Sequence, residues 1–225
     1  MTNIVVLCYE RYRLTVQCIE SIRKNTKPDE YTLTLVDDDS KDFRVRNFLR
    51  DQALYNPKNT TLLEVSNSRH CLGALKNLGV RHSELTFGRG EFLCILDNDV
   101  CVFPGWLDTL NEDDPNGSEV VLLGGVRHPF HGVNKEHEGW VETDAVAGYC
   151  HHFSWGWWDT CGPYDANASG IGQSEDFAFC QRLREYGPVG YCNPPVMAHC
   201  GITDSTGKPI AGAELIERVP GVLYL

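Results

Sequence analysis

Two carboxylates separated by one residue, Asp97 and Asp99, are the part of this sequence best suited to chemistry. They close the apolar run 92–96, which predicts a buried strand. Because side chains at i and i+2 of an extended segment point the same way, both acids are expected on one side of the strand end. Unpaired buried charge is costly, so such acids typically bind a cation or a polar ligand. The segment 97–99 is also good turn chemistry, and a plain turn is the alternative interpretation.

Coordination of a hard divalent cation is the chemistry that this acid pair favours. Mg²⁺ and Mn²⁺ bind one or two carboxylates and complete their shells with substrate phosphates. We therefore interpret 97–99 as a site that holds a diphosphate through Mn²⁺ or Mg²⁺. Zinc is a weaker alternative, because the His and Cys residues at 150–152 and 199–200 are irregularly spaced and the chain has no Cys-x-x-Cys pair.

Alternating strand and helix patterns must position these acids. Continuous apolar runs or two-residue alternation predict strands, and apolar residues every three to four positions predict helices. The expected strands are 4–8, 31–36, 61–65 and 91–96, and the expected helices are 11–24, 42–54 and 72–80. This order is typical of βαβ units. The predicted fold class is α/β: one Rossmann-like domain with a mostly parallel central sheet flanked by helices.

Polar clusters follow three of these strands, at 8–11, 37–39 and 97–99. The carboxyl ends of parallel strands meet at one edge of a sheet, which is where such sheets bind ligands. We therefore expect the three clusters to form one site.

The second half of the chain is less regular. We expect strands at 120–123 and 189–192, a helix at 174–186 and a loop-rich stretch at 132–148. No internal repeat or linker interrupts the sequence, so 1–225 is expected to be a single domain. Its expected parts are a nucleotide-binding half at 1–100, an acceptor-binding half at 101–200 and a C-terminal tail at 201–225.

Composition narrows the possible partners and the compartment. The net charge of −11 disfavours non-specific nucleic-acid binding, and an anionic substrate would need a metal or local cations. No run approaches the roughly 18 apolar residues of a transmembrane segment. The first residues do not have the pattern of a signal peptide. The ten cysteines are therefore expected to be thiols, and the protein is expected in the cytoplasm.

The order of these motifs resembles the family 2 glycosyltransferases, which have the GT-A fold. The resemblance runs from about Asn3 to about Gly201. It rests on NIVVLCYERYRLTVQCIESI, LVDDDSKD, GALKNLGV, LCILDNDV, DAVAGYCHHFSWGWWDTCGPYD, SEDFAFCQRLREYG and AHCG. It implies a metal-dependent transfer of a sugar from a nucleotide diphosphate sugar, with UDP the default nucleotide, to an acceptor hydroxyl.

The resemblance also implies roles for individual residues. The donor-binding residues that it implies are Tyr9, Glu10, Arg11, Asp37, Asp38, Lys76, Asp97 and Asn98. Asp99 and His199 match the metal ligands of the family. Asp39 stands where the family usually has Gly, a residue that adopts positive φ more readily.

An acid pair at the start of the helix 174–186 matches the position of the family's catalytic base. Asp176 is expected to be the base, and Glu175 is expected to bind acceptor hydroxyls. The acceptor needs a proton acceptor on the face of the sugar opposite the departing diphosphate, and a single displacement there inverts the anomeric carbon. Alternatively, both acids only complement the helix dipole.

An aromatic cluster offers a platform for the acceptor, because sugars and bases stack on aromatic faces. Its candidate residues are Trp155, Trp157, Trp158 and His152. The alternative is that these residues are core. Gly170 and Gly172, just before the acid pair, suggest a loop that closes over the donor.

The acceptor stays open at this point: a glycan, a lipid-linked sugar, a protein or a hydroxymethylated DNA base. Two other functions also use acids at a strand end. A sugar nucleotidyltransferase normally has a Gly-rich basic loop after the first strand, which 8–11 lacks. A non-catalytic nucleotide-sugar-binding module would have no need of a base at Asp176.

Overall fold

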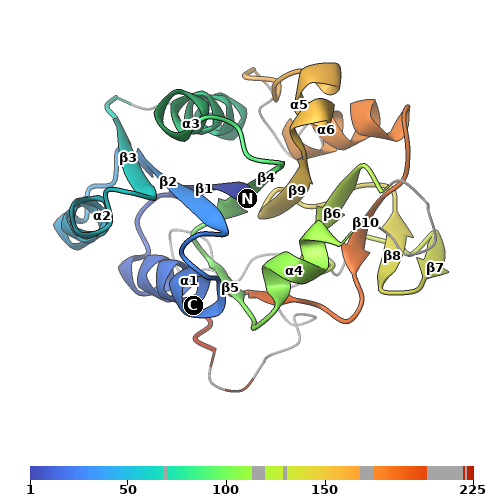
Figure 1. Cartoon of the computed structure of the whole chain (residues 1–225), viewed down its shortest axis with the longest axis horizontal. Coiled ribbons are helices and arrows are strands. Elements are labelled where there is room, and N and C mark those ends of the chain that lie inside the picture. Colours follow the sequence, from blue (N-terminus) through green and yellow to red (C-terminus); the bar gives the residue numbers. More distant parts are fainter. Residues whose placement is uncertain (68–69, 113–119, 129–130, 168–174, 202–219, 221) are drawn as a thin grey trace.

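Figure 1 shows the computed structural model of the chain, which describes residues 1–67, 70–112, 120–128, 131–167, 175–201, 220 and 222–225. Its helices and strands, in chain order, are β1 (Thr2–Cys8), α1 (Tyr12–Asn25), β2 (Tyr31–Asp38), α2 (Phe43–Tyr55), β3 (Thr60–Val65), α3 (Leu72–Phe87), β4 (Phe92–Asp97), β5 (Val100–Val102), α4 (Trp106–Asn111), β6 (Leu122–Gly124), β7 (Lys135–His137), β8 (Trp140–Thr143), β9 (Cys150–Ser154), α5 (Trp155–Cys161), α6 (Glu175–Arg184), β10 (Val189–Cys192) and β11 (Met197–His199).

One sheet connects nine of these strands in the order β3-β2-β1-β4-β9-β6-β10-β8-β7, and β11 and β5 form a second, two-stranded sheet. Strands β8 and β9 run against the other seven strands of the large sheet. The predicted fold class is therefore confirmed: the central sheet is mostly parallel and flanked by helices.

The register of the parallel strands brings their carboxyl ends to one edge. Cys8 at the end of β1 lies opposite Asp37 of β2, and Leu7 lies opposite Asp97 of β4. All residues of β1 and β2 are buried, which explains the apolar run 4–8 of β1, whereas β2 also buries Thr and Asp side chains. We call the edge formed by the carboxyl ends of these strands the carboxyl edge. The opposite edge, where β1 and β4 begin, is called the amino edge.

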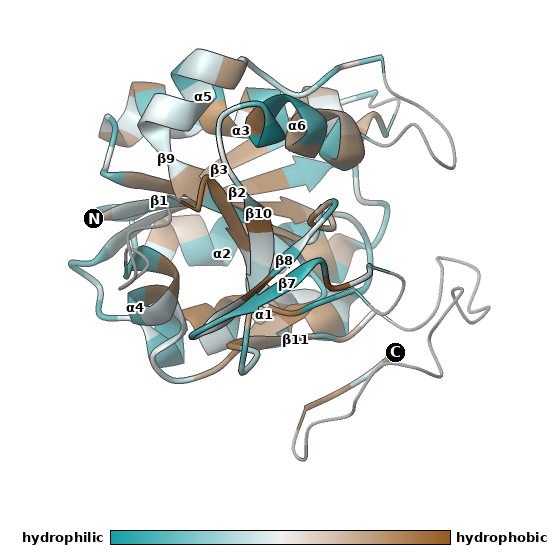
Figure 2. Cartoon of the chain, turned by 90° about the vertical axis from the view of Figure 1, so that its right-hand side faces the viewer, coloured by the Kyte–Doolittle hydropathy of each residue, from teal (hydrophilic) through white to brown (hydrophobic). Residues whose placement is uncertain are grey.

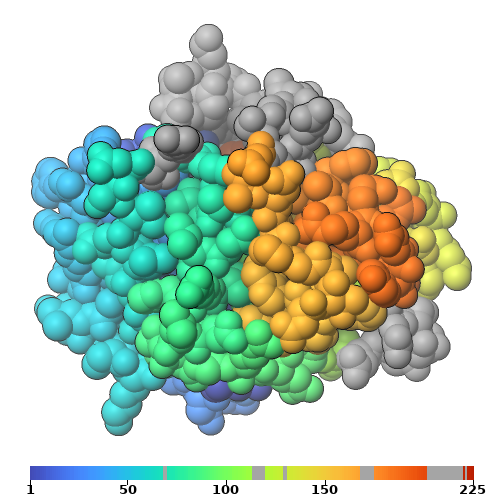
Figure 3. All heavy atoms as spheres, turned by 90° about the horizontal axis from the view of Figure 1, so that it is seen from above, coloured from blue at the N-terminus to red at the C-terminus, as the bar shows by residue number. Residues whose placement is uncertain are grey.

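Helices cover both faces of the sheet, and each face has its own core (Figures 1 and 2). Helices α1, α2 and α4 pack on one face, through Cys18, Ile22, Leu49 and Trp106 among others. Helices α3, α5 and α6 pack on the other face, through Leu75, Val80, Trp155 and Phe179 among others. Figure 3 shows these last three helices side by side on the outer surface of their layer.

The second half differs from its prediction most at 132–148, which was expected to be loop-rich but contains β7 and β8. Strand β9 inserts antiparallel between β4 and β6. Its centre carries His151, whose two ring nitrogens lie 2.7 Å from the Tyr164 hydroxyl and 3.0 Å from the Val146 carbonyl oxygen. These partners lie outside the strand, and they allow polar residues to be buried in it. The sequence of such a strand therefore lacks the apolar pattern that would predict it.

Helix α3 continues to Phe87, beyond the expected end at residue 80. Ser83 is buried, so one side of the added turns packs against the rest of the protein. Gly88 ends the helix with φ of 74°. Among the described residues, no helix is long and apolar enough to cross a membrane. All ten cysteines are described, and each is a free thiol.

Candidate active site

Asp99, just after β4, meets side chains from two other parts of the chain. Asp99 accepts a hydrogen bond from Arg11, with 2.6 Å between Nη1 and Oδ2. Its other oxygen, Oδ1, lies 3.4 Å from Nε2 of His199, at the end of β11. The β11–β5 pairing sets this contact, since His199 lies opposite Val100. The structure thus brings together the predicted metal ligands, Asp99 and His199.

The charges of this group shift one another's pKa values. Burial raises the pKa of Asp97 to about 7; the Lys76 charge opposes this shift, and the Asp99 charge adds to it. Burial by itself would raise the pKa of Asp99, but the neighbouring His199 and the charge of Arg11 lower it. Asp99 in turn raises the pKa of His199 against the effect of burial. Asp99 is therefore the ionised member of the acid pair near neutral pH.

These residues fit a divalent cation by their chemistry and spacing. Oδ1 of Asp99 is buried and has no hydrogen-bond partner among the described residues. Two adjacent ligands of an octahedral cation with bonds of about 2.1 Å are about 3 Å apart, and the Asp99–His199 separation of 3.4 Å is close to this. Within the described ranges, however, no three His, Cys, Asp or Glu side chains converge on one point, so substrate oxygens would have to complete the shell.

A second set of charges lies where α3 meets α6. Lys76 donates a hydrogen bond of 2.7 Å to Glu175, and the two side chains are only 1% and 8% exposed. The ammonium group also lies 4.9 Å from the centre of the Tyr164 ring. Next to Glu175, Asp176 accepts a hydrogen bond of 2.9 Å from the backbone N–H of Gly148. Glu175 is therefore held in an ion pair, whereas Asp176 remains partly exposed.

Two glycines of α3 allow this arrangement. A methyl group at Gly79 would overlap Val5 and Val36 of the sheet, and one at Gly73 would overlap the Asp165 carbonyl oxygen and touch Glu175. The helix therefore approaches both the sheet and α6 closely, which places Lys76 inside the protein. Both glycines belong to the segment that resembles the family.

The acids of the two sets lie close enough to influence one another. Lys76 and Glu175 both contribute to the pKa of Asp97, with opposite signs. Tyr149 connects the sets, because its ring stacks on His199 at 4.3 Å and its neighbour Gly148 binds Asp176. One site at the carboxyl edge therefore contains both groups of acids.

The loops after β1, β2 and β3 form the other end of this site. Asp38 lies 2.7 Å from Nδ1 of His70, whose ring packs against Tyr9 at 4.6 Å. Asp37 is buried, which raises its pKa, and it accepts a hydrogen bond from the backbone N–H of Ser40. The expected nucleotide contacts Tyr9, Asp37 and Asp38 are thus gathered in one place.

All non-glycine residues with positive φ in the described structure belong to these loops. They are Glu10, Arg11, Asp39, Asn67 and His70. Asp39, where the family usually has Gly, has φ of 57°, so the backbone keeps a conformation that glycine adopts most readily. Unfavourable backbone conformations of this kind tend to cluster at functional sites.

Two residues expected to bind the donor make hydrogen bonds within the loops of the site. The Glu10 carboxylate accepts hydrogen bonds from the backbone N–H groups of Lys41 and Asp42, at 2.5 and 3.2 Å. The Asn98 amide donates to the Thr15 hydroxyl at 2.6 Å and is 7% exposed as a residue. Their polar groups are occupied within the protein, so we assign Glu10 and Asn98 to the support of the site.

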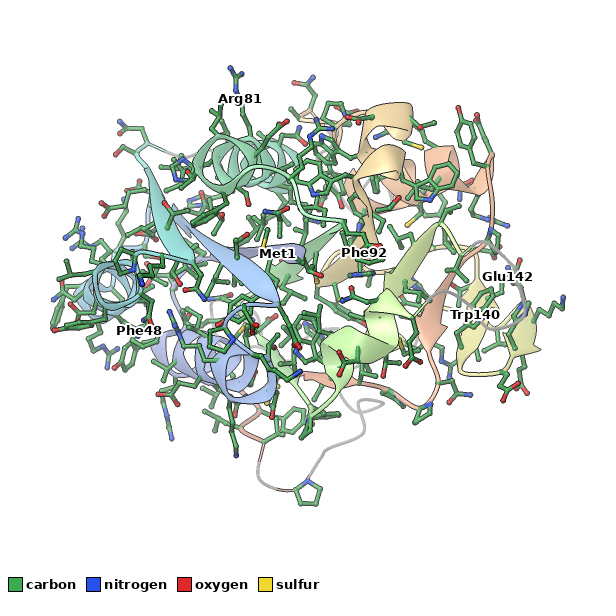
Figure 4. All side chains as sticks on the ribbon, in the orientation of Figure 1. Met1, Phe48, Arg81, Phe92, Trp140 and Glu142 are labelled. Carbon is green, nitrogen blue, oxygen red and sulfur yellow. The ribbon has the colours of Figure 1, made fainter. Side chains whose placement is uncertain are left out.

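The four residues expected to form an acceptor platform are not brought to the carboxyl edge. Trp155 donates a hydrogen bond to Asn3 near the start of β1, at the amino edge. The His152 ring packs against Phe92, which Figure 4 labels beside Met1 at that same edge. Both therefore lie at the wrong end of the strands for contact with Asp97 or Asp99.

The remaining two tryptophans are also placed by packing. Trp158 packs among Phe153, Tyr164 and Phe179 in the core between the sheet, α5 and α6. Trp157 contacts Tyr186, beyond the C-terminal end of α6, roughly 15 Å along the helix from Asp176. The core alternative therefore describes this cluster better, because apolar burial outweighs exposure of an aromatic face.

Burial of His152 leads to a prediction on acid stability. It lowers the pKa of His152 from 6.5 to about 3. The unfolded chain therefore binds a proton at this residue as the pH falls below about 6.5, whereas the folded protein does not, and acid favours unfolding. We expect the free energy of unfolding to fall by roughly 3 kcal/mol more in the wild type than in His152→Gln between pH 7 and pH 4. Urea denaturation at the two pH values measures this difference, and equal losses would contradict it.

Sequence reasoning missed several residues beside Asp176. His128 and His131 are close enough for the Asp176 charge to raise their pKa values, although burial lowers both overall. His131 also lies 2.6 Å from the Tyr191 hydroxyl. The spacing of these residues carries no periodic signal, so only the fold could place them here. The expected mobile loop at Gly170 and Gly172 lies outside the described residues.

Comparison with known proteins agrees with this geometry. The sequence model described as Glycosyl transferase family 2 matches residues 3–165. The chain belongs to this family, and the resemblance stated from its motifs is confirmed. No curated protein sequence matches the chain significantly.

Solved structures with the same fold are glycosyltransferases. GalNAc-T7 with UDP, GalNAc and Mn²⁺ aligns with a TM-score of 0.69 and 15% identity over 88% of this chain. The mannosyltransferase PcManGT of Pyrobaculum calidifontis with GDP-Man and Mn²⁺ gives 0.61 and 16% over 84%. TarS 1–349 of S. aureus with UDP gives 0.63 and 16% over 84%. These likenesses establish the GT-A fold, and this chain spans 43%, 56% and 57% of the respective proteins.

Proposed function

We propose that this protein is an inverting, metal-dependent glycosyltransferase that moves a sugar from a nucleotide diphosphate sugar to an acceptor hydroxyl. The observation that carries this proposal is the meeting of two sets of acids at the carboxyl edge. Asp97, Asp99 and His199 lie on the strand side, and Asp176 lies on the helix side. The family assignment and the nucleotides bound in the similar structures support it.

UDP is the nucleotide that we favour for the donor. Tyr9, Asp37 and Asp38 would bind the uridine end, at the loops after β1 and β2. The diphosphate would then lie toward Asp99. GalNAc-T7 and TarS are described with UDP, and PcManGT with GDP-Man, so both uridine and guanosine donors belong in the test.

Asp99 and His199 would hold a Mn²⁺ or Mg²⁺ ion, which when bound supplies positive charge to the leaving diphosphate. Asp176 would accept the proton of the acceptor hydroxyl as its oxygen forms a bond to the anomeric carbon. The bond from that carbon to the phosphate oxygen breaks, and its electron pair leaves with the diphosphate. Attack opposite the leaving group inverts the anomeric configuration.

Neighbouring groups would orient Asp176. The backbone N–H of Gly148 holds one oxygen, and the N–H of Phe177 lies 2.7 Å from the other. Lys76 holds the adjacent Glu175 within the protein. We therefore assign Glu175 to positioning rather than to direct binding of acceptor hydroxyls.

A donor screen with Mn²⁺ tests the proposal without knowledge of the acceptor. At a concentration near 100 times Kd, the correct nucleotide sugar should raise the melting temperature by roughly 5–10 °C. Slow hydrolysis of the same compound should accompany this shift, and EDTA should abolish both. Asp99→Asn should lose the metal-dependent shift, whereas Asp51→Asn, an exposed acid on α2, should keep it. The proposal is wrong if no nucleotide sugar stabilises the protein and none is hydrolysed.

A further inference from the structure

Arg11 pairs with the same carboxylate that would hold a metal ion. Its Nη1 lies 2.6 Å from Oδ2 of Asp99, while His199 lies beside Oδ1. The Asp99 side chain is 10% exposed and the Arg11 side chain 26%. A buried carboxylate is costly without a partner, so the protein supplies the compensating charge from its own chain.

The backbone around Arg11 is built to hold this contact. Glu10 and Arg11 have φ of 49° and 52°, two successive left-handed conformations that are unfavourable for residues other than glycine. The Thr15 hydroxyl shares its single proton between the carbonyl oxygens of both residues, at 3.2 and 3.3 Å. A methyl group at Gly201 would overlap Oδ2 of Asp99 and Nη1 of Arg11. The ion pair is therefore covered on one side by close backbone.

We propose that Arg11 is an internal counter-ion that competes with the metal for Asp99 and is drawn away by the diphosphate of the donor. The inference rests on the proposed function and specifies its regulation: metal and donor bind cooperatively because both must displace the same ion pair. A guanidinium group at Oδ2 and a divalent cation at Oδ1 would repel each other across one carboxylate. A guanidinium fork also matches phosphate oxygens, so the arriving diphosphate offers Arg11 a new partner.

This competition predicts two linked changes when the Arg11 charge is removed. If the metal binds only molecules in which Asp99 is not paired with Arg11, its apparent affinity equals its intrinsic affinity multiplied by the fraction of such molecules. We expect Arg11→Gln to bind Mn²⁺ about tenfold more tightly than the wild type in the absence of nucleotide. The tightening of Mn²⁺ binding by UDP should shrink by a similar factor, because the coupling between two ligands is reciprocal.

Electron paramagnetic resonance tests this directly, since free hydrated Mn²⁺ gives a signal that falls as the ion binds. The full chain is titrated with Mn²⁺, alone and with UDP, as wild type, Arg11→Gln and Arg13→Gln. Arg13 is exposed in the first turn of α1, two residues after Arg11, so its substitution removes the same charge without touching Asp99. Arg13→Gln should behave as the wild type. Arg11→Met, which keeps an apolar stem, provides a second neutral variant if Arg11→Gln does not fold.

Tighter Mn²⁺ binding by a folded neutral variant at position 11, with weaker coupling to UDP, supports the proposal. Unchanged or weaker binding, or no binding to any variant, overturns it. The comparison with Mn²⁺ alone needs no nucleotide, so it decides the role of Arg11 even when the donor screen fails. Conversely, a successful donor screen with no effect of Arg11 on the metal leaves the proposed function standing without this regulation.

Discussion

Replacing Asp176 with Asn is expected to lower donor turnover by about a thousandfold while changing donor affinity by less than about twofold. The amide nearly matches the carboxylate in shape, so it can stay beside the N–H of Gly148. It cannot accept the proton that the attacking hydroxyl releases. Slow hydrolysis of the donor, in which water takes the place of the acceptor, measures turnover. Calorimetric titration with UDP and Mn²⁺ measures affinity.

Glu185→Gln is the matched control for this substitution, because it removes an exposed acid near the other end of α6. It should leave both turnover and affinity unchanged. Retained turnover in Asp176→Asn would move the base to another residue. A chain that binds donor but hydrolyses none, with or without Asp176, would be a binding module instead.

Replacing Lys76 with Met is expected to destabilise the protein by about 3–5 kcal/mol. The substitution leaves the Glu175 carboxylate, which is 8% exposed, without its partner. It also removes the ammonium group beside the Tyr164 ring. Chemical denaturation followed by tryptophan fluorescence measures the loss.

A double substitution separates the ion pair from general packing. Lys76→Met with Glu175→Leu should recover most of the stability, because well-packed apolar residues often replace a buried ion pair without loss. Arg50→Met is the exposed comparison: its pair with Glu64 is equally short at 2.6 Å, but the side chains are 55% and 43% exposed. We expect it to cost less than about 1 kcal/mol. A loss as small as this in Lys76→Met would contradict the burial of the pair.

The parallel half of the fold could be predicted from the sequence because its signals are local. The buried strands β1 and β4 contain continuous apolar runs, and β2 alternates apolar residues with Thr. The helices between them repeat apolar residues at helical spacing. Asp37, Asp97 and Asp99, which are typical turn residues, lie at the ends of these strands or just after them. A parallel sheet then brings these acids to one edge without any further information.

The acceptor side could not be predicted in the same way. Strands β7, β8 and β9 are short or polar, and they become strands because neighbouring strands supply their hydrogen bonds. The tryptophans of α5 looked like a binding surface, but their positions follow from core packing at a distance from the acids. An aromatic residue has the same sequence signal in a core as on a binding face.

By itself, then, the sequence determined the α/β class, the family, and the acids that end its strands. Tertiary structure alone decided which partner each charge has. Arg11 and Asp99 are 88 residues apart in the chain, and Lys76 and Glu175 are 99 apart. No local pattern encodes such pairs, because they depend on the register of the sheet and on how closely α3 approaches it. The same long-range contacts decide which carboxylate is buried in an ion pair, like Glu175, and which, like Asp176, remains partly exposed.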